Sequence, residues 1–432
     1  MSEHSGLGDL LRSLRMTADV TIEALAELSG VSDRTISDIE RGVSGAPQHR
    51  TLVALADALR LDPDARETVF AAARTARSAR RSVGGPVGAH RPPPLRQRVT
   101  GFTGRERELA TALSLLSVTT AVAAPALVIS GGPGSGKTAT ALELIGRTRR
   151  WPTTVVADLN GLGAPTSPTQ LLQELLRQLP GGDERMPSSL DDAARRWKWL
   201  TARNPPLVLL DNAANEAQIR PVLALSARGA VVVTSRRSLA GLEGVSRITL
   251  GALDREASIR LLEREIPADR RHPIDIIRLV EFADGMPLAL RIAADAITRG
   301  PLTNTGDLVA ALRATDDRPS AFAAGHESVA ASIALSYDAL DAHTAELFRD
   351  ISVIDRESFD ASLAAALSTD PTAEAWIVEA RLDELADQGL LEVLGGDRYR
   401  LGALMRSFAH ARLLENLGDV GLAERLQRAA SR

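Results

Sequence analysis

Residues Ala126 to Thr138 read ALVISGGPGSGKT, a short apolar run followed at once by a glycine-rich segment that ends in Gly-Lys-Thr. The run has the β-branched, apolar composition of a buried strand, and the segment after it has the spacing GxxxxGK[ST]. Phosphate groups need many N–H donors at short range, so the backbone around them must curl tightly, which glycine permits. The stretch therefore predicts a strand, a phosphate-binding loop (P-loop), and a helix whose N-terminus faces the same anion.

Individual residues of this loop have separate expected roles. Lys137 is expected to reach the β- and γ-phosphates of a nucleotide, and the Thr138 hydroxyl to bind Mg²⁺. Lysine occurs only here and at Lys198, all other Lys/Arg positions being arginine, so this position requires a compact charge rather than a planar one. The further expected nucleotide contacts are Gly132, Pro133, Gly134, Ser135, Gly136 and Ala139.

Composition limits the classes to which the chain can belong. Its 432 residues suffice for about three or four domains, and a hydrophobic content of 44% is ordinary for a globular protein. The absence of cysteine excludes disulfides, thiolate zinc sites and cysteine nucleophiles. A net charge of -4 gives no chain-wide basic field, so any DNA binding must be local. Neither a signal peptide nor an apolar run of bilayer length is recognisable, and we expect a cytoplasmic protein without a membrane partner.

The N-terminal region has the pattern of a small all-helical domain. Thr21 can cap one helix and Ser32 the next, with Gly30 in the turn between them, which is typical of a helix-turn-helix. The segments LRxxR, TIEALAELSGVS and RTISDIERG resemble the Xre-type, or phage-repressor-like, family. In that family Arg15 and Glu40 would form a structural ion pair. The resemblance implies base-edge contacts by Asp33, Arg34 and Ser37 and phosphate contacts by Thr35 and Arg41.

The same residues leave a second interpretation open. Asp33, Asp38 and Glu40 lie on or beside the expected recognition helix and face a phosphate-rich partner unfavourably. An acid can nevertheless accept a hydrogen bond from cytosine. We expect the module to bind double-stranded DNA, and the alternative is a protein-interaction adaptor.

Beyond this module, apolar runs alternate with helical stretches. The runs at residues 154–159, 207–210, 231–234 and 247–250 predict a parallel sheet whose ligand lies at the carboxyl ends of the strands. Asp211 directly follows one run, where an aspartate behind a P-loop binds Mg²⁺ directly or through water. Arg236 follows the next run, where a cation either senses a γ-phosphate or is simply a surface residue.

Five ordered motifs resemble the NB-ARC core of the STAND-class ATPases, and more narrowly the actinomycete regulators that place an Xre-type module before it. They are FTGRE, GGPGSGKT, LVLLDNA, TSRR and GMPLAL. The resemblance implies a slow ATPase used as a switch, closed with ADP and opened by ATP. It also implies that Phe102 and Arg105 lie near the base, that Pro287 touches adenine, and that Arg236 is the sensor arginine.

The C-terminal pattern is typical of a winged helix with a hairpin turning at residues 395–397. Members of the family often carry Met-His-Asp after this hairpin, and the histidine holds the ADP phosphate. Here Leu401, Gly402 and Ala403 occupy those positions, so the latch is expected to be absent. Asn212 stands where many relatives have a second acid, and an amide cannot accept a proton from the attacking water, so hydrolysis should be slow.

We therefore expect a multidomain protein with an all-α module, an α/β P-loop sheet, a helical domain and a winged helix. Its expected function is ATP/ADP-switched transcription regulation, with DNA, further copies of the chain, and an unidentified sensor protein or ligand as partners. The alternatives are a signalling or defence ATPase with an N-terminal adaptor, and a housekeeping ATPase with a vestigial N-terminus. The expected segments are 1–81, DNA-binding; 82–100, a basic Gly/Pro linker; 101–251, nucleotide-binding; 252–325, helical; and 326–432, winged helix and tail.

Overall fold

The structure is a computed structural model with two compact units, residues 1–91 and 92–432. Within the described residues, no helix is long and apolar enough to cross a membrane. In the first unit the described positions are 7–18, 20–29, 31, 36–37, 40, 55–56, 58–59, 61, 66 and 69. In the second they are 102–117, 124–148, 150–159, 166–182, 186–226, 229–300, 302–315, 317–324, 327–368 and 374–430.

The described part of the first unit is helical, with α1 (Leu7–Thr17) and α2 (Ile22–Ser29). The expected cap of α2 is present, since the Thr21 hydroxyl accepts a hydrogen bond from the Ala24 N–H at 3.2 Å. The predicted ion pair is also confirmed, because Arg15 Nε lies 2.6 Å from Glu40 Oε1 and both side chains are largely buried. Among the described residues of the unit, one apolar cluster is formed by Leu11, Leu25, Ile36, Leu55, Leu59 and Val69.

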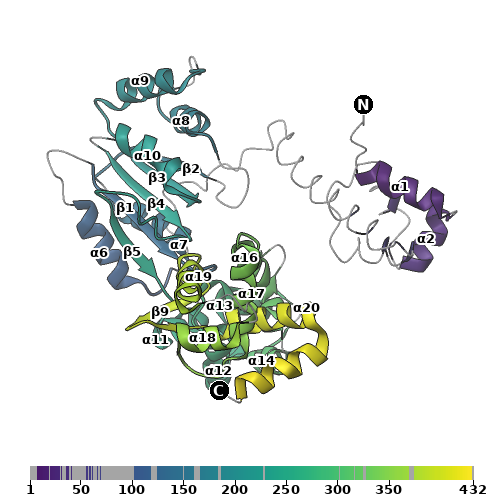
Figure 1. The fold of residues 1–432 in the computed structure, drawn as a ribbon. Coiled ribbons are helices and arrows are strands. Elements are labelled where there is room, and N and C mark those ends of the chain that lie inside the picture. Colours follow the sequence, from purple (N-terminus) through teal and green to yellow (C-terminus); the bar gives the residue numbers. More distant parts are fainter. Residues whose placement is uncertain are drawn as a thin grey trace. The chain divides into compact units, whose positions relative to one another are not determined.

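The second unit contains a five-stranded parallel sheet in the order β2-β3-β4-β1-β5 (Figure 1). The middle strand is thus β4, which separates the P-loop strand β1 from β3. All the predicted apolar runs became strands, because a strand buried on both faces of a parallel sheet needs a continuous apolar sequence. The strands are β1 (Ala126–Gly131), β2 (Thr154–Asp158), β3 (Leu207–Ala213), β4 (Ala230–Ser235) and β5 (Ser246–Leu250).

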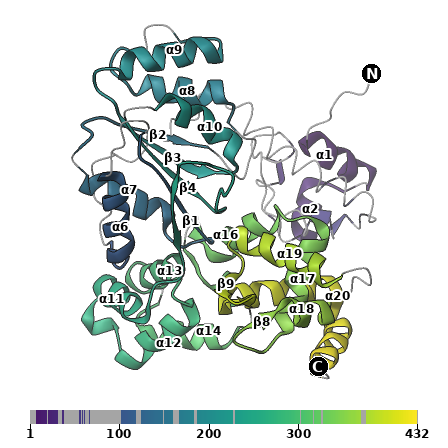
Figure 2. The ribbon, with the colours of Figure 1, turned by 60° about the vertical axis from the view of Figure 1, so that its left-hand side comes forward.

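Helices cover both faces of the sheet (Figure 2). Successive residues of β1 point to opposite faces, so Leu127 packs with α6 and α7, whereas Val128 packs with α8, α9 and α10. Both residues are fully buried. These helices are α6 (Glu106–Ser117), α7 (Lys137–Arg147), α8 (Pro168–Arg177), α9 (Leu190–Thr201) and α10 (Glu216–Leu225).

A helical segment follows the sheet and shares one apolar core with everything after it. Pro287 begins α13, where a missing N–H costs no hydrogen bond, so the GMPLAL motif marks a helix start. The elements of this segment are α11 (Arg255–Glu265), η1 (Ala268–Arg270), α12 (Pro273–Ala283), α13 (Pro287–Thr298), α14 (Thr305–Arg313), α15 (Arg318–Ala321), β6 (Ala323–Ala324) and β7 (Glu327–Ser328).

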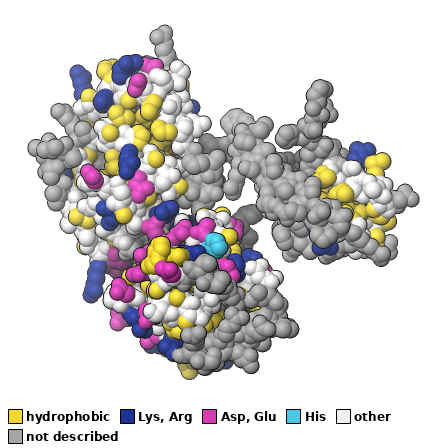
Figure 3. Space-filling view, in the orientation of Figure 1, with side chains coloured by type: hydrophobic (Ala, Val, Ile, Leu, Met, Phe, Trp, Pro, Cys, Tyr) yellow, Lys and Arg dark blue, Asp and Glu magenta, His cyan; other side chains and the backbone are white. Residues whose placement is uncertain are grey.

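The C-terminal module, defined as α16 to α20, has the order helix–helix–strand–helix–helix–hairpin–helix, and its first strand pairs with the hairpin in a three-stranded sheet. Its assignment as a winged helix stays a prediction. Its hairpin turns as predicted, with positive φ at Gly395, Gly396 and Asp397. On the face seen in Figure 3, acidic and apolar side chains gather over α19 and β9, where Trp376, Val393 and Leu394 are exposed. The elements are α16 (Val329–Tyr337), α17 (Ala342–Asp350), η2 (Ile351–Val353), β8 (Phe359–Asp360), α18 (Ala361–Leu367), α19 (Ala375–Asp387), β9 (Glu392–Gly395), β10 (Arg398–Arg400) and α20 (Ala403–Ala430).

Candidate functional site

The P-loop requires glycine at its four positions for two different structural reasons. Gly131, Gly134 and Gly136 adopt φ of 151°, 68° and 86°, a region that side chains disfavour. Gly132 does not, but a Cβ on it would lie 2.6 Å from the carbonyl oxygen of Gly389 in the C-terminal module. Three glycines therefore shape the loop, and the fourth admits the backbone of another part of the chain.

Lys137, the first residue of α7, bends back over the loop. Its Nζ donates hydrogen bonds of 2.8 Å to the carbonyl oxygens of Gly131 and Gly132. Burial lowers the pKa of Lys137 to about 7, with Arg236 acting in the same direction and Asp211 opposing it. The ammonium group of Lys137 thus lies at the loop with too little negative charge around it. A bound anion would supply that charge.

A β-bulge directs Asp211 toward the P-loop. The register between β3 and β4 shifts between Leu210 and Ala213, and Asn212 adopts a φ of 58°. Asp211 accepts hydrogen bonds from the hydroxyls of Thr138, at 2.9 Å to Oδ1, and Thr234. Burial raises the pKa of Asp211, and these two hydrogen bonds oppose the rise. The structure thus brings together the two residues predicted to bind Mg²⁺.

Two polar neighbours of Asp211 were missed from the sequence. Asp158 ends β2 directly opposite Asp211 in the strand register, and the amide Nδ2 of Asn212 lies 3.5 Å from its Oδ1. Thr234 accepts the Asn212 N–H at 2.9 Å while it donates to Asp211. The motif TVVAD ends in an acid just as LVLLD does, and this similarity could have identified Asp158.

Arg236 follows β4 and contacts the C-terminal module. Its Nη1 donates to Ser336 Oγ at 2.5 Å and to the Ser332 carbonyl oxygen at 2.9 Å, both on α16. Burial lowers the pKa of Arg236 to about 10. The residue is therefore not a free surface arginine, since it joins the edge of the phosphate site to α16.

The next two residues are bound by a carboxylate that the sequence did not single out. Asp387, at the end of α19, accepts hydrogen bonds from Arg237 Nε at 2.7 Å, from the Ser238 N–H at 3.0 Å and from the Ser238 hydroxyl at 2.8 Å. Asp387 is one of several acids on α19, and nothing in its local sequence distinguishes it. We call these contacts the Asp387 clamp.

The base cavity, of about 430 Å³, opens beside the P-loop and α7. Phe102, Arg105 and Pro287 line it together with Gly136 and Ala139, so it collects the residues expected near a base. Arg105 is buried, and its Nη2 donates to the carbonyl oxygens of Ser135, at 3.4 Å, and Gly251. Arg105 therefore holds backbone at the loop, and its expected position near the base stays a prediction.

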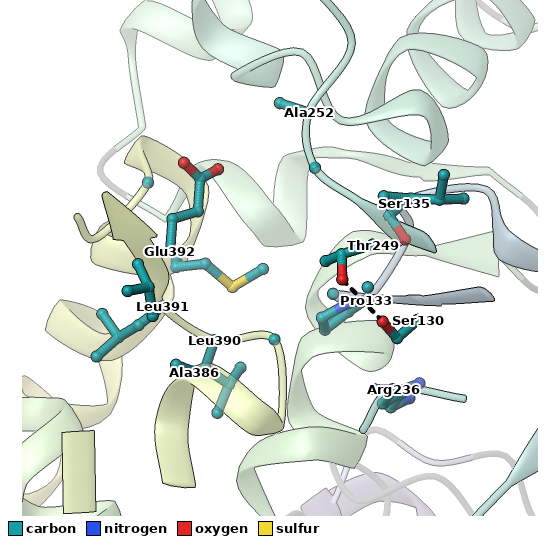
Figure 4. Close-up of a pocket in the computed structure, with 18 of the residues that line it drawn as sticks. Ser130, Pro133, Ser135, Arg236, Thr249, Ala252, Ala386, Leu390, Leu391 and Glu392 are labelled. Atoms are coloured by element: carbon teal, nitrogen blue, oxygen red, sulfur yellow. Dashed lines mark hydrogen bonds between the residues drawn. The ribbon is translucent and has the colours of Figure 1, made fainter. Parts of the chain in front are cut away.

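The junction cavity, of about 670 Å³, also adjoins the loop and shares Ser135 and Pro287 with the base cavity (Figure 4). Pro133, Ser130 and Thr249 from the core face Leu390 and Leu391 of the C-terminal module across it. The module and the P-loop therefore meet at one cavity.

The latch positions also line the junction cavity. Asp284, which caps the end of α12 in a left-handed conformation, accepts the Ala403 N–H at 2.8 Å. A Cβ on Gly402 would lie 2.4 Å from Asp284 Oδ2. In this arrangement a carboxylate occupies the space that a side chain at position 402 would require, as expected for a chain without the histidine latch.

The loop residues fit a nucleotide and Mg²⁺. The Ser135 hydroxyl is buried and has no hydrogen-bond partner in the described part of the chain, although a buried hydroxyl ordinarily requires one. Leu288 N–H donates to the Gly134 carbonyl oxygen at 3.2 Å, so α13 is fixed to the loop. A phosphate would accept from the Ser135 hydroxyl and pair with Lys137, while Thr138 and Asp211 offer oxygen ligands of the type that Mg²⁺ prefers.

Most residues expected to bind DNA lie outside the described residues. These are Asp33, Arg34, Thr35 and Arg41. Ser37 is described, is helical and is half-buried. The roles of all five stay predictions.

Known proteins match both the N-terminal helical region and the region with the P-loop. A helix-turn-helix domain family matches residues 6–69. The regulatory protein AfsR of Streptomyces coelicolor is 32% identical over 334 residues, covering 74% of this chain, and its Streptomyces griseus counterpart is 31% identical over 330 residues. A solved Walker-type ATPase of Pyrococcus abyssi aligns with a TM-score of 0.51 at 15% identity, covering 72% of this chain and 97% of that one.

The chain contains a helix-turn-helix domain and a P-loop ATPase fold. The resemblance of the N-terminal region to a helix-turn-helix family is confirmed, and so is the similarity of the chain to regulatory proteins. The chain spans about a third of the length of the two AfsR proteins that it matches, 33% in both cases.

Proposed function

We propose that the protein is a transcription regulator that binds DNA through its helix-turn-helix module and is switched by ATP and ADP. The observation that carries this proposal is the contact of Arg236 with α16, because it joins the edge of the phosphate site to the C-terminal module. Similarity to two regulatory proteins and the helix-turn-helix match support the DNA-binding part.

Nucleotide binding would use the groups gathered at the loop. Lys137, Ser135 and the N-terminal N–H groups of α7 would hold phosphates, Thr138 and Asp211 would hold Mg²⁺, and Pro287 and Phe102 would face the base. Bound Mg²⁺ supplies a local positive charge that neutralises the phosphates. Asn212 cannot act as a base, so we propose slow hydrolysis that resets the switch rather than rapid turnover.

The closed arrangement places backbone of the C-terminal module against the loop. Gly389 packs on Gly132, and the Asp387 clamp and Arg236 hold the module to the core. A third phosphate at this end of the loop would compete with Gly389 for space and with α16 for Arg236. ATP would therefore favour an open form that ADP does not require, which is a shift of populations by differential affinity.

Opening would expose surfaces through which copies of the chain associate. Neighbouring helix-turn-helix modules would then bind adjacent half-sites, and avidity would raise the affinity for DNA without any new protein–DNA contact.

The test is selection of fragmented genomic DNA by the purified protein, with ADP and with a non-hydrolysable ATP analogue in parallel. We expect one enriched sequence, enriched more strongly with the ATP analogue, and loss of enrichment for Arg34→Ala. Equal enrichment with both nucleotides would contradict the switch. No enrichment with either would favour a protein-interaction adaptor.

A further inference from the structure

A further cavity, of about 320 Å³, lies at the edge of the sheet opposite to the P-loop. Pro205 and Pro206, which line it, directly precede β3, and Gly229 directly precedes β4. Because the strands of this sheet run parallel, these positions mark their amino ends, whereas the P-loop follows the carboxyl end of β1. We call this space the amino-end pocket, and it shares no described lining residue with the base cavity or the junction cavity.

Two buried residues that line the amino-end pocket carry polar groups without a hydrogen-bond partner in the described part of the chain. Trp197, on α9, is 1% exposed, and the unpartnered group is its indole Nε1. Ser226, which directly follows α10, is 6% exposed, and the unpartnered group is its hydroxyl. An indole N–H can only donate, and a serine hydroxyl rotates freely enough to donate as well. Unpaired buried donors cost free energy, so an acceptor bound in the pocket would stabilise the folded chain.

The charged side chain at the amino-end pocket is positive. Lys198, in the last turn of α9, is the only charged residue among the described lining residues, and it forms no ion pair or hydrogen bond with any of the described residues. It is also one of only two lysines in the chain, the other being Lys137 at the P-loop. The C-terminal ends of α9 and α10 lie nearby and carry partial negative charge, which Lys198 offsets. The Thr201 hydroxyl already donates to the Trp197 carbonyl oxygen at 2.8 Å, so the side-chain groups left for a ligand are donors.

The rest of the described pocket wall is apolar and close-packed. Pro205, Pro206 and Leu225 contribute hydrocarbon surface, and the fixed φ of the two prolines makes this wall rigid. A Cβ on Gly229 would lie 2.2 Å from the Pro206 carbonyl oxygen, so the start of β4 packs directly against the prolines. At about 320 Å³ the pocket is near the lower limit of small-molecule sites. It therefore suits a compact ligand with an apolar body and one acceptor group.

We propose that the amino-end pocket binds a small, mainly apolar monocarboxylate. Its carboxylate accepts hydrogen bonds from the Trp197 indole N–H and the Ser226 hydroxyl, and the Lys198 ammonium group balances its charge. Its apolar body packs against the two prolines and Leu225. The site goes beyond the nucleotide switch, because it lies at the other edge of the sheet and requires no nucleotide.

The test titrates the full chain with phenylacetate and follows the indole N–H signals of its four tryptophans by ¹⁵N–¹H NMR. We expect the Trp197 signal, identified by its loss in Trp197→Phe, to shift saturably, because this N–H gains an acceptor. The signal of Trp199, which is 69% exposed on the same helix and does not line the pocket, should stay in place. Phenylacetamide, the neutral probe of the same shape, should bind about tenfold more weakly, because the hydrogen bonds are no longer charge-assisted.

Two variants test the other donors. Ser226→Ala should weaken phenylacetate binding by about tenfold, yet leave thermal unfolding of the ligand-free chain unchanged, since its hydroxyl has no partner to lose. Lys198→Met keeps most of the apolar stem and should weaken binding by about two- to fivefold, because this charge is exposed to solvent. The control is Arg203→Met, which removes a charge from an exposed residue just beyond α9 that does not line the pocket, and should leave binding unchanged.

Four results would overturn the proposal. They are the absence of saturable phenylacetate binding, equal binding of the two probes, binding unaffected by Ser226→Ala in a variant that unfolds at the same temperature as the parent chain, and a Trp197 signal that stays in place when phenylacetate is saturating. An unmoved Trp197 signal would mean that the pocket holds only water.

Discussion

Replacing Asp387 with alanine should release the C-terminal module from the core. The substitution removes three hydrogen bonds, from Arg237 Nε and from the N–H and hydroxyl of Ser238. The Arg237 side chain is 47% exposed and that of Asp387 22%, so the ion pair is discounted for solvent screening. With the two Ser238 bonds, the loss is about 2 kcal/mol, which shifts the closed–open equilibrium by about 30-fold.

Stopped-flow dissociation of a fluorescent ADP analogue measures this shift, and we expect dissociation to accelerate by up to that factor. Hydrogen exchange gives a readout that needs no nucleotide, since the Ser238 amide should lose protection. Asp383→Ala is the matched control, because Asp383 lies on the same helix but bonds to Tyr399 within the module. If both variants release the analogue at the same rate and Ser238 stays protected in both, the clamp does not hold the module.

Three further predictions concern the loop and the latch region. Thr138→Val should remove most of the Mg²⁺-dependent part of nucleotide affinity, measured with and without EDTA, because the Thr138 hydroxyl and Asp211 are the expected ligands. Gly402→Ala should lower the free energy of unfolding by about 1–3 kcal/mol, since its Cβ would meet Asp284, whereas Gly251→Ala, at an open position, should change it little in chemical denaturation. The pKa of Asp284 is raised in the folded chain, so at pH just above 3.8 the folded chain holds a proton that the unfolded chain has lost. The free energy of unfolding should therefore fall as the pH rises through the folded pKa. Asp284→Asn should remove this pH dependence of stability.

The site could be predicted where it depends on the ends of parallel strands. Such ends meet at one edge of a sheet, so Lys137 and Asp211 could be brought together from motifs alone. The bulge that turns Asp211 toward Thr138 could not, because it depends on how β3 pairs with β4 and on the left-handed Asn212. A register shift has no local sequence signal beyond the asparagine itself.

The contacts between the sheet and the C-terminal module could not be predicted. Asp387 is separated from Ser238 by 149 residues, and either side of the clamp alone looks like an ordinary helix end or strand end. The sequence shows a glycine at position 402, where the family often has histidine, but it does not show that Asp284 lies beside that glycine, because this contact depends on where α12 ends relative to α20.

The residue at position 132 indicates whether a related chain can bring its C-terminal module against the P-loop. Its φ does not require glycine, and Gly389 would be suited to its helix end in any case because it adopts a φ of 69°. Only the approach of the Gly389 carbonyl oxygen, 2.6 Å from where a Cβ would stand, excludes a side chain at position 132. A relative with alanine there would have to keep its C-terminal module away from the loop. The identity of this one residue therefore sorts homologous sequences by the conformation they can reach.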